Sequence, residues 1–66
     1  MANQTQLTTV KGVAQPAQRA LAQAGYVHVE DLNGVVESEL QNLHGMGPKA
    51  LRILKEELQV RGLSFA

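Results

Sequence analysis

Residues 43–51 read LHGMGPKAL and lead into the most regular helical pattern of the chain. Proline suits the first position of a helix, because the N–H group that it lacks would have no intrahelical partner there. After Pro48, apolar residues recur at the spacings of one helix face: Ala50, Leu51, Ile53, Leu54 and Leu58. Gly62 is a natural stop, and Arg61 lies near the negative end of the helix dipole. The sequence therefore predicts a helix over residues 48–61.

The turn before this helix predicts a backbone site that is open to an anion. Gly45 and Gly47 can take positive φ without steric cost, and they leave the backbone uncovered. Met46, between them, is expected to point inward and hold the turn against the core. The unpaired N–H groups at the start of the helix, together with the positive end of its dipole, attract groups such as phosphate.

The donors of such a site follow from the residues at the start of the helix. Pro48 has no N–H group, so they would be the amides of Gly47, Lys49 and Ala50. The Lys49 side chain would add a mobile positive charge at the same place. Spacing alone also allows the turn to be no more than a tight corner between two packed helices.

The rest of the chain reads as shorter helical segments. A second helix is predicted over residues 16–24, bounded by a proline and a glycine. HVEDL (28–32) and ESELQNL (37–43) allow two helical turns each at most, with the turn dipeptide Asn33-Gly34 between them. Nothing alternates with period two over more than a few residues, which argues against strands. We expect an all-α fold, a compact bundle of four to five short helices.

The chain also resembles itself at an offset of 33 residues, with no gap needed. The aligned pairs are Leu7 and Leu40, Val10 and Leu43, Gly12 and Gly45, Val13 and Met46, Ala17 and Ala50, Arg19 and Arg52, and Leu21 and Leu54. Internal similarity at a fixed offset is typical of repeated supersecondary units. We interpret the chain as two degenerate helix-turn-helix units, the second of which is better preserved.

Length and composition exclude several classes of function. Sixty-six residues form one domain with a thin core and no room for a deep catalytic cavity. The absence of cysteine excludes disulfides, a thiolate nucleophile and a Cys-based zinc site. His28 and His44 have no obvious partner, and nothing in the sequence supplies a nucleophile with a base, a metal cluster or a cavity. We therefore expect no metal, no cofactor, no small-molecule substrate and no enzymatic activity. With neither a secretory signal nor an apolar stretch long enough for a membrane, we expect a cytoplasmic protein.

The charges are balanced in number but segregated along the chain. The net charge is zero, with six basic and six acidic residues. Residues 1–29 carry Lys11 and Arg19 and no acid, whereas residues 30–39 carry four acids and no base. This distribution permits a basic face on a neutral protein. The acidic segment 30–39 would then lie on the opposite side, where a protein partner could bind.

The hairpin resembles the helix-hairpin-helix motif of DNA repair, recombination and transcription proteins. That motif runs apolar-x-Gly-apolar-Gly-x-Lys-x-small, and the residues that match it are Gly45, Met46, Gly47, Lys49 and Ala50. From about Thr8 to Phe65 the chain is similar to the C-terminal domain of the bacterial RNA polymerase alpha subunit, where a degenerate first unit precedes such a hairpin. The resemblance implies a SAM-like helix-hairpin-helix fold, and hairpin amides that hold a DNA backbone phosphate without reading bases.

The same resemblance implies which residues face DNA. In that domain the DNA face docks on the minor groove and combines the second hairpin with a basic residue that opens the first unit. Lys11 stands at the latter position here, and Gly47 and Lys49 stand at the hairpin positions. Two departures, Lys11 for an arginine and Ala14 for a polar amide, affect minor-groove sequence preference more than backbone binding.

We therefore expect a small module that binds the backbone of double-stranded DNA with little sequence choice. The expected DNA-binding residues are Lys11, Arg19, His44, Gly45, Gly47, Lys49, Ala50 and Arg52. For Arg52, an ion pair with Glu56 at i+4 is the alternative to a phosphate contact. His44 would lie near a phosphate, so that DNA would bind slightly better at low pH.

The alternative function is a protein-interaction module that docks a transcription partner through the acidic segment 30–39. In either case, we expect a flexible N-terminus over residues 1–7 and a single domain over residues 8–66. Tyr26 and Phe65, the two aromatic residues, are expected to close the core at helix ends.

Overall fold

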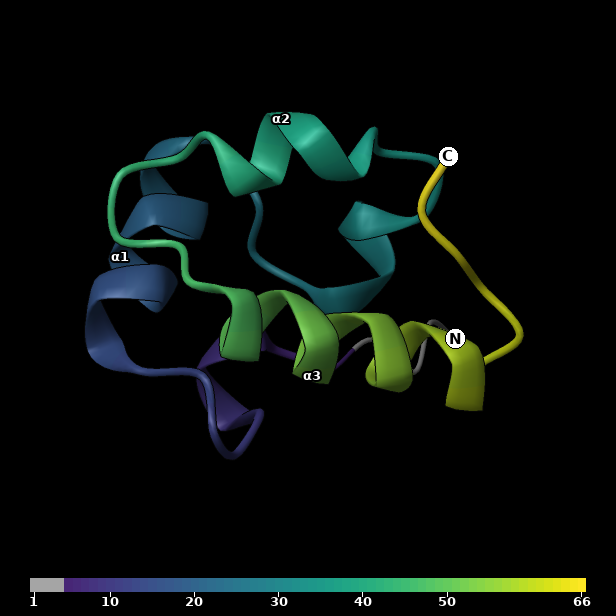
Figure 1. The fold of residues 1–66 in the computed structure, drawn as a ribbon. Helices are drawn as coiled ribbons and strands as arrows, with labels where there is room; N and C mark the ends of the chain where they lie inside the picture. The colour runs from purple at the N-terminus through teal and green to yellow at the C-terminus, as the bar shows by residue number, and fades with distance from the viewer. Residues whose placement is uncertain (1–4) are drawn as a thin grey trace.

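The computed structural model describes residues 5–66, and every regular element in this part of the chain is helical (Figure 1). In chain order they are η1 (Leu7–Thr9), α1 (Gln15–Gln23), η2 (Val29–Leu32), α2 (Glu37–Gln41) and α3 (Pro48–Val60), where η denotes a short 3-10 helix. The expected all-α class is confirmed, with three α-helices and two 3-10 helices among the described residues. Gln6 and His28 form an isolated antiparallel bridge.

Both prolines begin α-helices, as the sequence predicts. Pro48 is the first residue of α3, and Pro16 is the second residue of α1. At these positions a missing N–H group costs no helical hydrogen bond. Helix α1 begins one residue before the predicted start at residue 16 and ends one residue before the predicted end at residue 24. Helix α3 ends one residue before the predicted end at Arg61.

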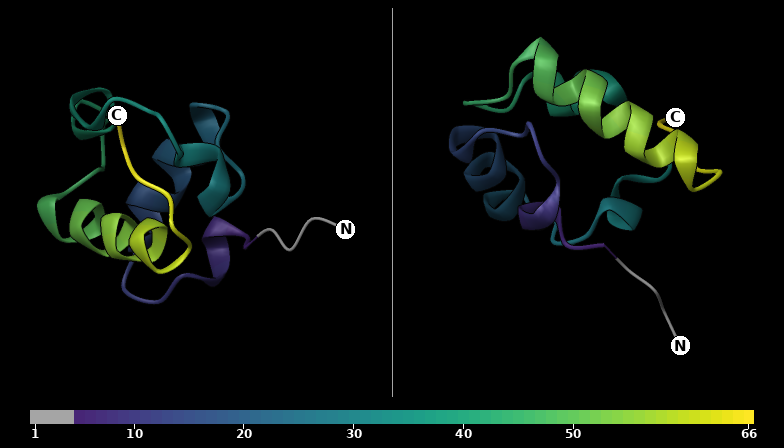
Figure 2. Two further views of the ribbon diagram at one scale, coloured as in Figure 1. Left: turned by 90° about the vertical axis from the view of Figure 1, so that its right-hand side faces the viewer. Right: turned by 90° about the horizontal axis from the view of Figure 1, so that it is seen from below.

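Helix α3 organises the domain. It packs against η2 and α2. Figure 1 shows α2 above α3, with the turn that follows α2 leading back to the start of α3. The views in Figure 2 place η1, α1 and η2 together on one side of α3. The turn between α2 and α3 therefore lies at the end of the domain where α1 begins.

The core is aliphatic and draws on every element. Its most deeply buried side chains are Leu21, Val29, Leu32, Leu40, Leu54 and Leu58. Tyr26 and Phe65 are partly buried and pack against this cluster, as expected for aromatic residues that close a small core. Since full burial of one such aliphatic side chain contributes about 1.5–3 kcal/mol, this cluster is the main source of stability.

The folded part begins earlier than predicted. Of the expected flexible segment 1–7, residues 1–4 lie outside the described residues, but residues 5–7 belong to the fold. The Leu7 N–H donates to the Val27 carbonyl at 3.0 Å, and the Val29 N–H donates to the Thr5 carbonyl at 2.8 Å. Leu7 is also buried in the core. Residues 5–7 are therefore held in place by the burial of Leu7 and by these backbone hydrogen bonds, although their sequence pattern predicts a flexible segment.

Arg61 joins three segments at the C-terminal end of α3. Its Nη1 donates to the Glu57 carbonyl at 2.7 Å and to Glu57 Oε1 at 2.8 Å. Its Nη2 donates to Thr5 Oγ1 at 2.8 Å, and its Nε donates to Glu30 Oε2 at 3.2 Å. Glu30 Oε1 in turn accepts the Thr5 N–H at 2.9 Å. A planar guanidinium satisfies this many acceptors at once, whereas a lysine could not.

Acid is expected to weaken the fold through Glu30. The Thr5 N–H bond, and after it the Glu30 backbone and the Arg61 charge, holds the pKa of the Glu30 carboxyl below its ordinary value of 4.5. The unfolded chain therefore takes up this proton at higher pH than the folded chain does. Ionised Glu30 accordingly stabilises the fold above pH 4.5, and this stabilisation is lost as the pH falls through the lowered pKa.

The matched variant is Glu30→Gln, which keeps the side-chain length and one acceptor oxygen but does not titrate. Between about pH 6 and pH 3, the free energy of unfolding should fall less steeply in this variant than in the wild type. Urea denaturation at a series of pH values measures both slopes. Asp31, whose pKa is lowered by the N–H groups of His28 and Val27, leaves a residual slope in the variant. Identical slopes in the two proteins would contradict the role of Glu30.

Candidate nucleic-acid interface

Gly45 is required by the conformation of the turn between α2 and α3. Its φ is +94°, in the left-handed region that L side chains rarely adopt. A Cβ atom here would also lie 2.8 Å from the Pro16 carbonyl oxygen, so the turn packs directly on the first turn of α1. The next residue, Met46, is partly buried against the core, and its N–H donates to the Leu43 carbonyl at 3.1 Å. The inward position expected for Met46 is confirmed.

Gly47 differs from Gly45, because its φ is not positive. It has φ −108° and ψ 169°, an extended conformation that any residue can adopt, and it is the N-cap of α3. A Cβ atom at this position would meet nothing within 4 Å. The fold therefore does not require glycine here. Because Gly47 has no side chain, the start of α3 is open to solvent.

The N–H groups at this start are unpaired. The first bond of the helical series runs from the Leu51 N–H to the Gly47 carbonyl, at 3.1 Å. Within residues 5–66, the N–H groups of Gly47, Lys49 and Ala50 donate to no other protein group. Ala50 can contribute its backbone alone, because its side chain is buried in the core.

The basic residues divide into two groups by their ion pairing. Lys55 lies 3.8 Å from a Glu37 carboxylate oxygen, and Arg61 pairs with Glu30 and Glu57. The remaining four are exposed and have no acidic partner within the described part of the chain: Lys11, Arg19, Lys49 and Arg52. For Arg52 the structure therefore lacks the ion pair with Glu56 that the sequence left open. The paired bases lie towards the C-terminal end of α3, and the unpaired ones lie on the elements around its N-terminal end.

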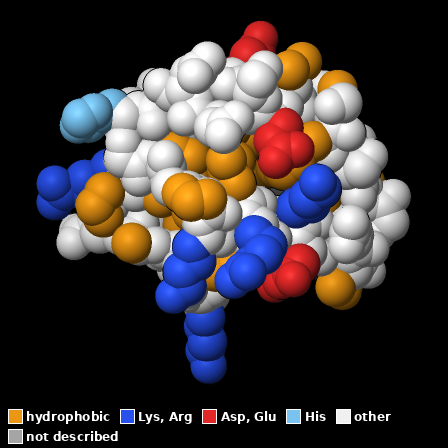
Figure 3. All heavy atoms as spheres, viewed as in Figure 1, with side chains coloured by type: hydrophobic (Ala, Val, Ile, Leu, Met, Phe, Trp, Pro, Cys, Tyr) orange, Lys and Arg blue, Asp and Glu red, His pale blue; other side chains and the backbone are white. Residues whose placement is uncertain are grey.

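Figure 3 shows the surface that results. Most of the Lys and Arg side chains lie over the lower and left-hand parts of this face, along the start of α3 and the loop before α1, and one lies at the right. The acidic side chains visible in the same view lie towards the right and the top. Charges of both signs therefore adjoin on the right of this face, whereas at its lower left the charged side chains are all basic.

Lys11 reaches this surface through a second glycine turn. Gly12 has φ +91°, and a Cβ atom there would lie 2.6 Å from Ile53 Cδ1. The turn that carries Lys11 consequently packs on α3 at Ile53. On the other side of the α3 start, Arg19 and His44 line a common groove with Gly45. The structure thus groups the predicted DNA-binding residues around the N-termini of α1 and α3.

Residues 33 positions apart occupy similar environments. Gly12 and Gly45 have φ values of +91° and +94°. Ala14 and Gly47 are both extended N-caps, of α1 and α3 respectively. Of the aligned pairs in these helices, the alanines and leucines are buried and the arginines are exposed. The backbone turn of the second unit is therefore also present in the first, although Ala14 places a methyl group where Gly47 has none.

The acidic segment 30–39 is largely engaged within the molecule. The Asp31 carboxylate accepts the N–H groups of His28 at 3.0 Å and Val27 at 3.2 Å, and these bonds lower its pKa. Glu30 and Glu37 have the basic partners described above.

Among the described residues no cluster of side chains is suited to hold a metal ion, and no helix has the length and apolar character needed to cross a membrane.

Comparison of the chain with known protein families, with curated proteins and with solved structures finds no match.

Proposed function

We propose that this chain is a small module that binds the phosphate backbone of double-stranded DNA with little sequence specificity. The observation that carries the proposal is the coincidence of two features at one place. Unpaired amides lie at the uncovered start of α3, and the four basic residues without acidic partners lie on α3 itself, in the groove beside Gly45 and in the turn that packs on α3. Free amides at a helix N-terminus together with mobile cations are the groups that hold phosphate in proteins.

Each group has a distinct part in the proposed contact. The amides of Gly47, Lys49 and Ala50 and the dipole of α3 bind one phosphate, and the Lys49 ammonium adds a point charge. Lys11 and Arg52 contact neighbouring phosphates from the adjacent turn and from the next turn of α3. None of these groups needs a base edge as acceptor, so the contact carries little sequence information.

The fold supports a helix-hairpin-helix interpretation of this site. The two glycine turns of similar φ, each leading into a helix through an extended N-cap, fit two such units of the kind found in the RNA polymerase alpha C-terminal domain. We infer from this likeness that the domain approaches DNA from the minor-groove side and acts in bacterial transcription. A protein partner at segment 30–39 is the second candidate, but three of its four carboxylates already have intramolecular partners.

The proposal predicts a salt-dependent affinity of defined steepness. About three phosphate contacts give a logarithmic slope of about −2.7 against salt, so affinity should fall roughly 40-fold between 50 and 200 mM. The dissociation constant should lie in the range of about 10⁻⁴ to 10⁻⁶ M that is usual for non-specific binding. Fluorescence anisotropy with two duplexes of unrelated sequence measures both quantities. Binding that does not depend on salt, or no binding at the lowest salt, would exclude the backbone contact.

A further inference from the structure

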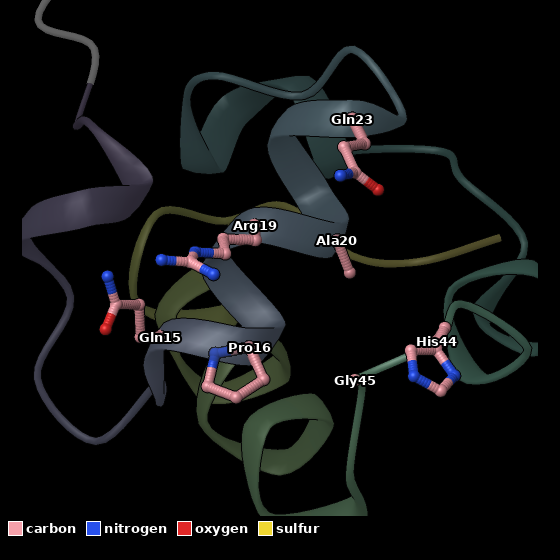
Figure 4. A pocket seen from close by; sticks show the side chains of 7 residues that line it. All are labelled: Gln15, Pro16, Arg19, Ala20, Gln23, His44 and Gly45. Carbon is pink, nitrogen blue, oxygen red and sulfur yellow. The ribbon is translucent and has the colours of Figure 1, made fainter.

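A groove lies between α1 and the turn that precedes α3, next to the proposed phosphate site. Its volume is about 320 Å³, at the lower end of the roughly 300–1,000 Å³ usual for ligand sites. Figure 4 shows Gln15, Arg19 and Gln23 along the α1 wall and His44 on the opposite wall, with Gly45 between. Because Gly45 belongs both to this groove and to the hairpin, the two sites adjoin each other.

The chemistry of the groove favours an anion that accepts several hydrogen bonds. The side chains that line it offer a guanidinium, two primary amides and an imidazole, and no carboxylate is among them. Arg19 has no acidic partner among residues 5–66, so its donors are available to a ligand. A guanidinium presents paired donors in the geometry of phosphate oxygens. The small floor, formed by Pro16 and Ala20, leaves space above it for the group that carries the phosphate.

We propose that this groove binds a further backbone phosphate of the same DNA duplex, beyond the three already described, through Arg19 and His44. The inference rests on the proposed function, because it assigns to the bound duplex a contact beyond the hairpin. Arg19 is the charged residue that lines the groove, and the imidazole of His44 lies on the opposite wall. Because the groove adds one phosphate contact, the salt slope should be steeper by about 0.9 than the −2.7 that three contacts give.

The first test compares two neutralising variants by anisotropy. Arg19→Gln should reduce the magnitude of the salt slope by about one, because one phosphate contact is lost. Lys55→Gln removes the same charge from α3 outside the groove and should leave the slope unchanged. Equal slopes for Arg19→Gln and Lys55→Gln would overturn the assignment of the groove.

The second test separates this inference from the proposed function. Nitrogen-15 spectra of the protein would be recorded with a DNA duplex, and separately with inorganic phosphate at the same ionic strength. Shifts of the Gln15 and Gln23 side-chain amides together with the Lys49 amide, on adding DNA, support both sites. Shifts at Lys49 alone overturn the groove and leave the proposed function standing. Groove shifts with inorganic phosphate but not with DNA overturn the assignment to a duplex and indicate a site for free phosphate.

Discussion

Gly45→Ala is expected to destabilise the protein by at least about 2 kcal/mol, a large fraction of the stability of so small a domain. Two costs add at this position. An L residue held in the left-handed region loses about 1–2 kcal/mol. The new methyl group would also lie 2.8 Å from the Pro16 carbonyl oxygen, which belongs to the backbone of α1 and cannot rotate away. Urea denaturation followed by circular dichroism measures the change in the free energy of unfolding.

Gly47→Ala is the matched control, two residues along the same turn. Its φ of −108° suits alanine, and a Cβ atom there meets nothing within 4 Å. Alanine is a poorer N-cap than glycine, so a loss of up to about 1 kcal/mol is expected. DNA affinity should nevertheless fall several-fold, because the methyl group stands at the entrance to the unpaired amides. If Gly47→Ala bound DNA as the wild type does, phosphate would not approach along this route.

The helical elements could be predicted because their signals are local. Pro48 and Gly62 bound α3, and a repeating apolar stripe between them can be buried only as one face of a helix. The positive φ of Gly45 follows from the same reasoning, since a short turn into a helix needs a residue free of steric restriction. In each of these cases the residues that decide the structure lie within one or two helical turns of each other.

Features that depend on contacts between distant segments could not be predicted. The sequence predicts for Arg61 only a favourable charge near a helix end. In the structure its side chain donates hydrogen bonds to Thr5 and Glu30, which are far from it in the sequence. The same contacts bring residues 5–7 into the fold. The groove between α1 and the hairpin depends on the packing of Gly45 against Pro16, and no local pattern in either segment indicates it.

The net charge of the sequence does not predict how charge is distributed over the surface, because ion pairing neutralises some basic residues and not others. Six basic and six acidic residues cancel in sum. In the folded chain, however, Lys55 and Arg61 are paired with acids, whereas the other four bases are not. The exposed pair of Lys55 with Glu37 contributes about 0–1 kcal/mol to stability, so its effect on the fold is small. The effect of ion pairing on the surface is larger, because the four basic residues without ion pairs keep their charge available to an anion.

Lys49→Glu should therefore weaken DNA binding far more than Lys55→Glu, although both variants have the same net charge. Each leaves five basic and seven acidic residues in place of six and six, a net charge of −2. Lys49→Glu removes one phosphate contact and places a carboxylate beside the unpaired amides, so affinity at 50 mM salt should fall at least about tenfold and the magnitude of the slope should fall by about 0.9.

Lys55→Glu breaks the exposed pair with Glu37, at a position that makes none of the proposed phosphate contacts. Its affinity should stay within about threefold of the wild type, and its stability within about 1 kcal/mol. Anisotropy titrations of both variants at matched salt make the comparison. Equal losses would mean that the overall charge governs binding, and the hairpin would then have no special part in it. A loss confined to Lys49→Glu places the contact at the start of α3, because the two variants have the same net charge.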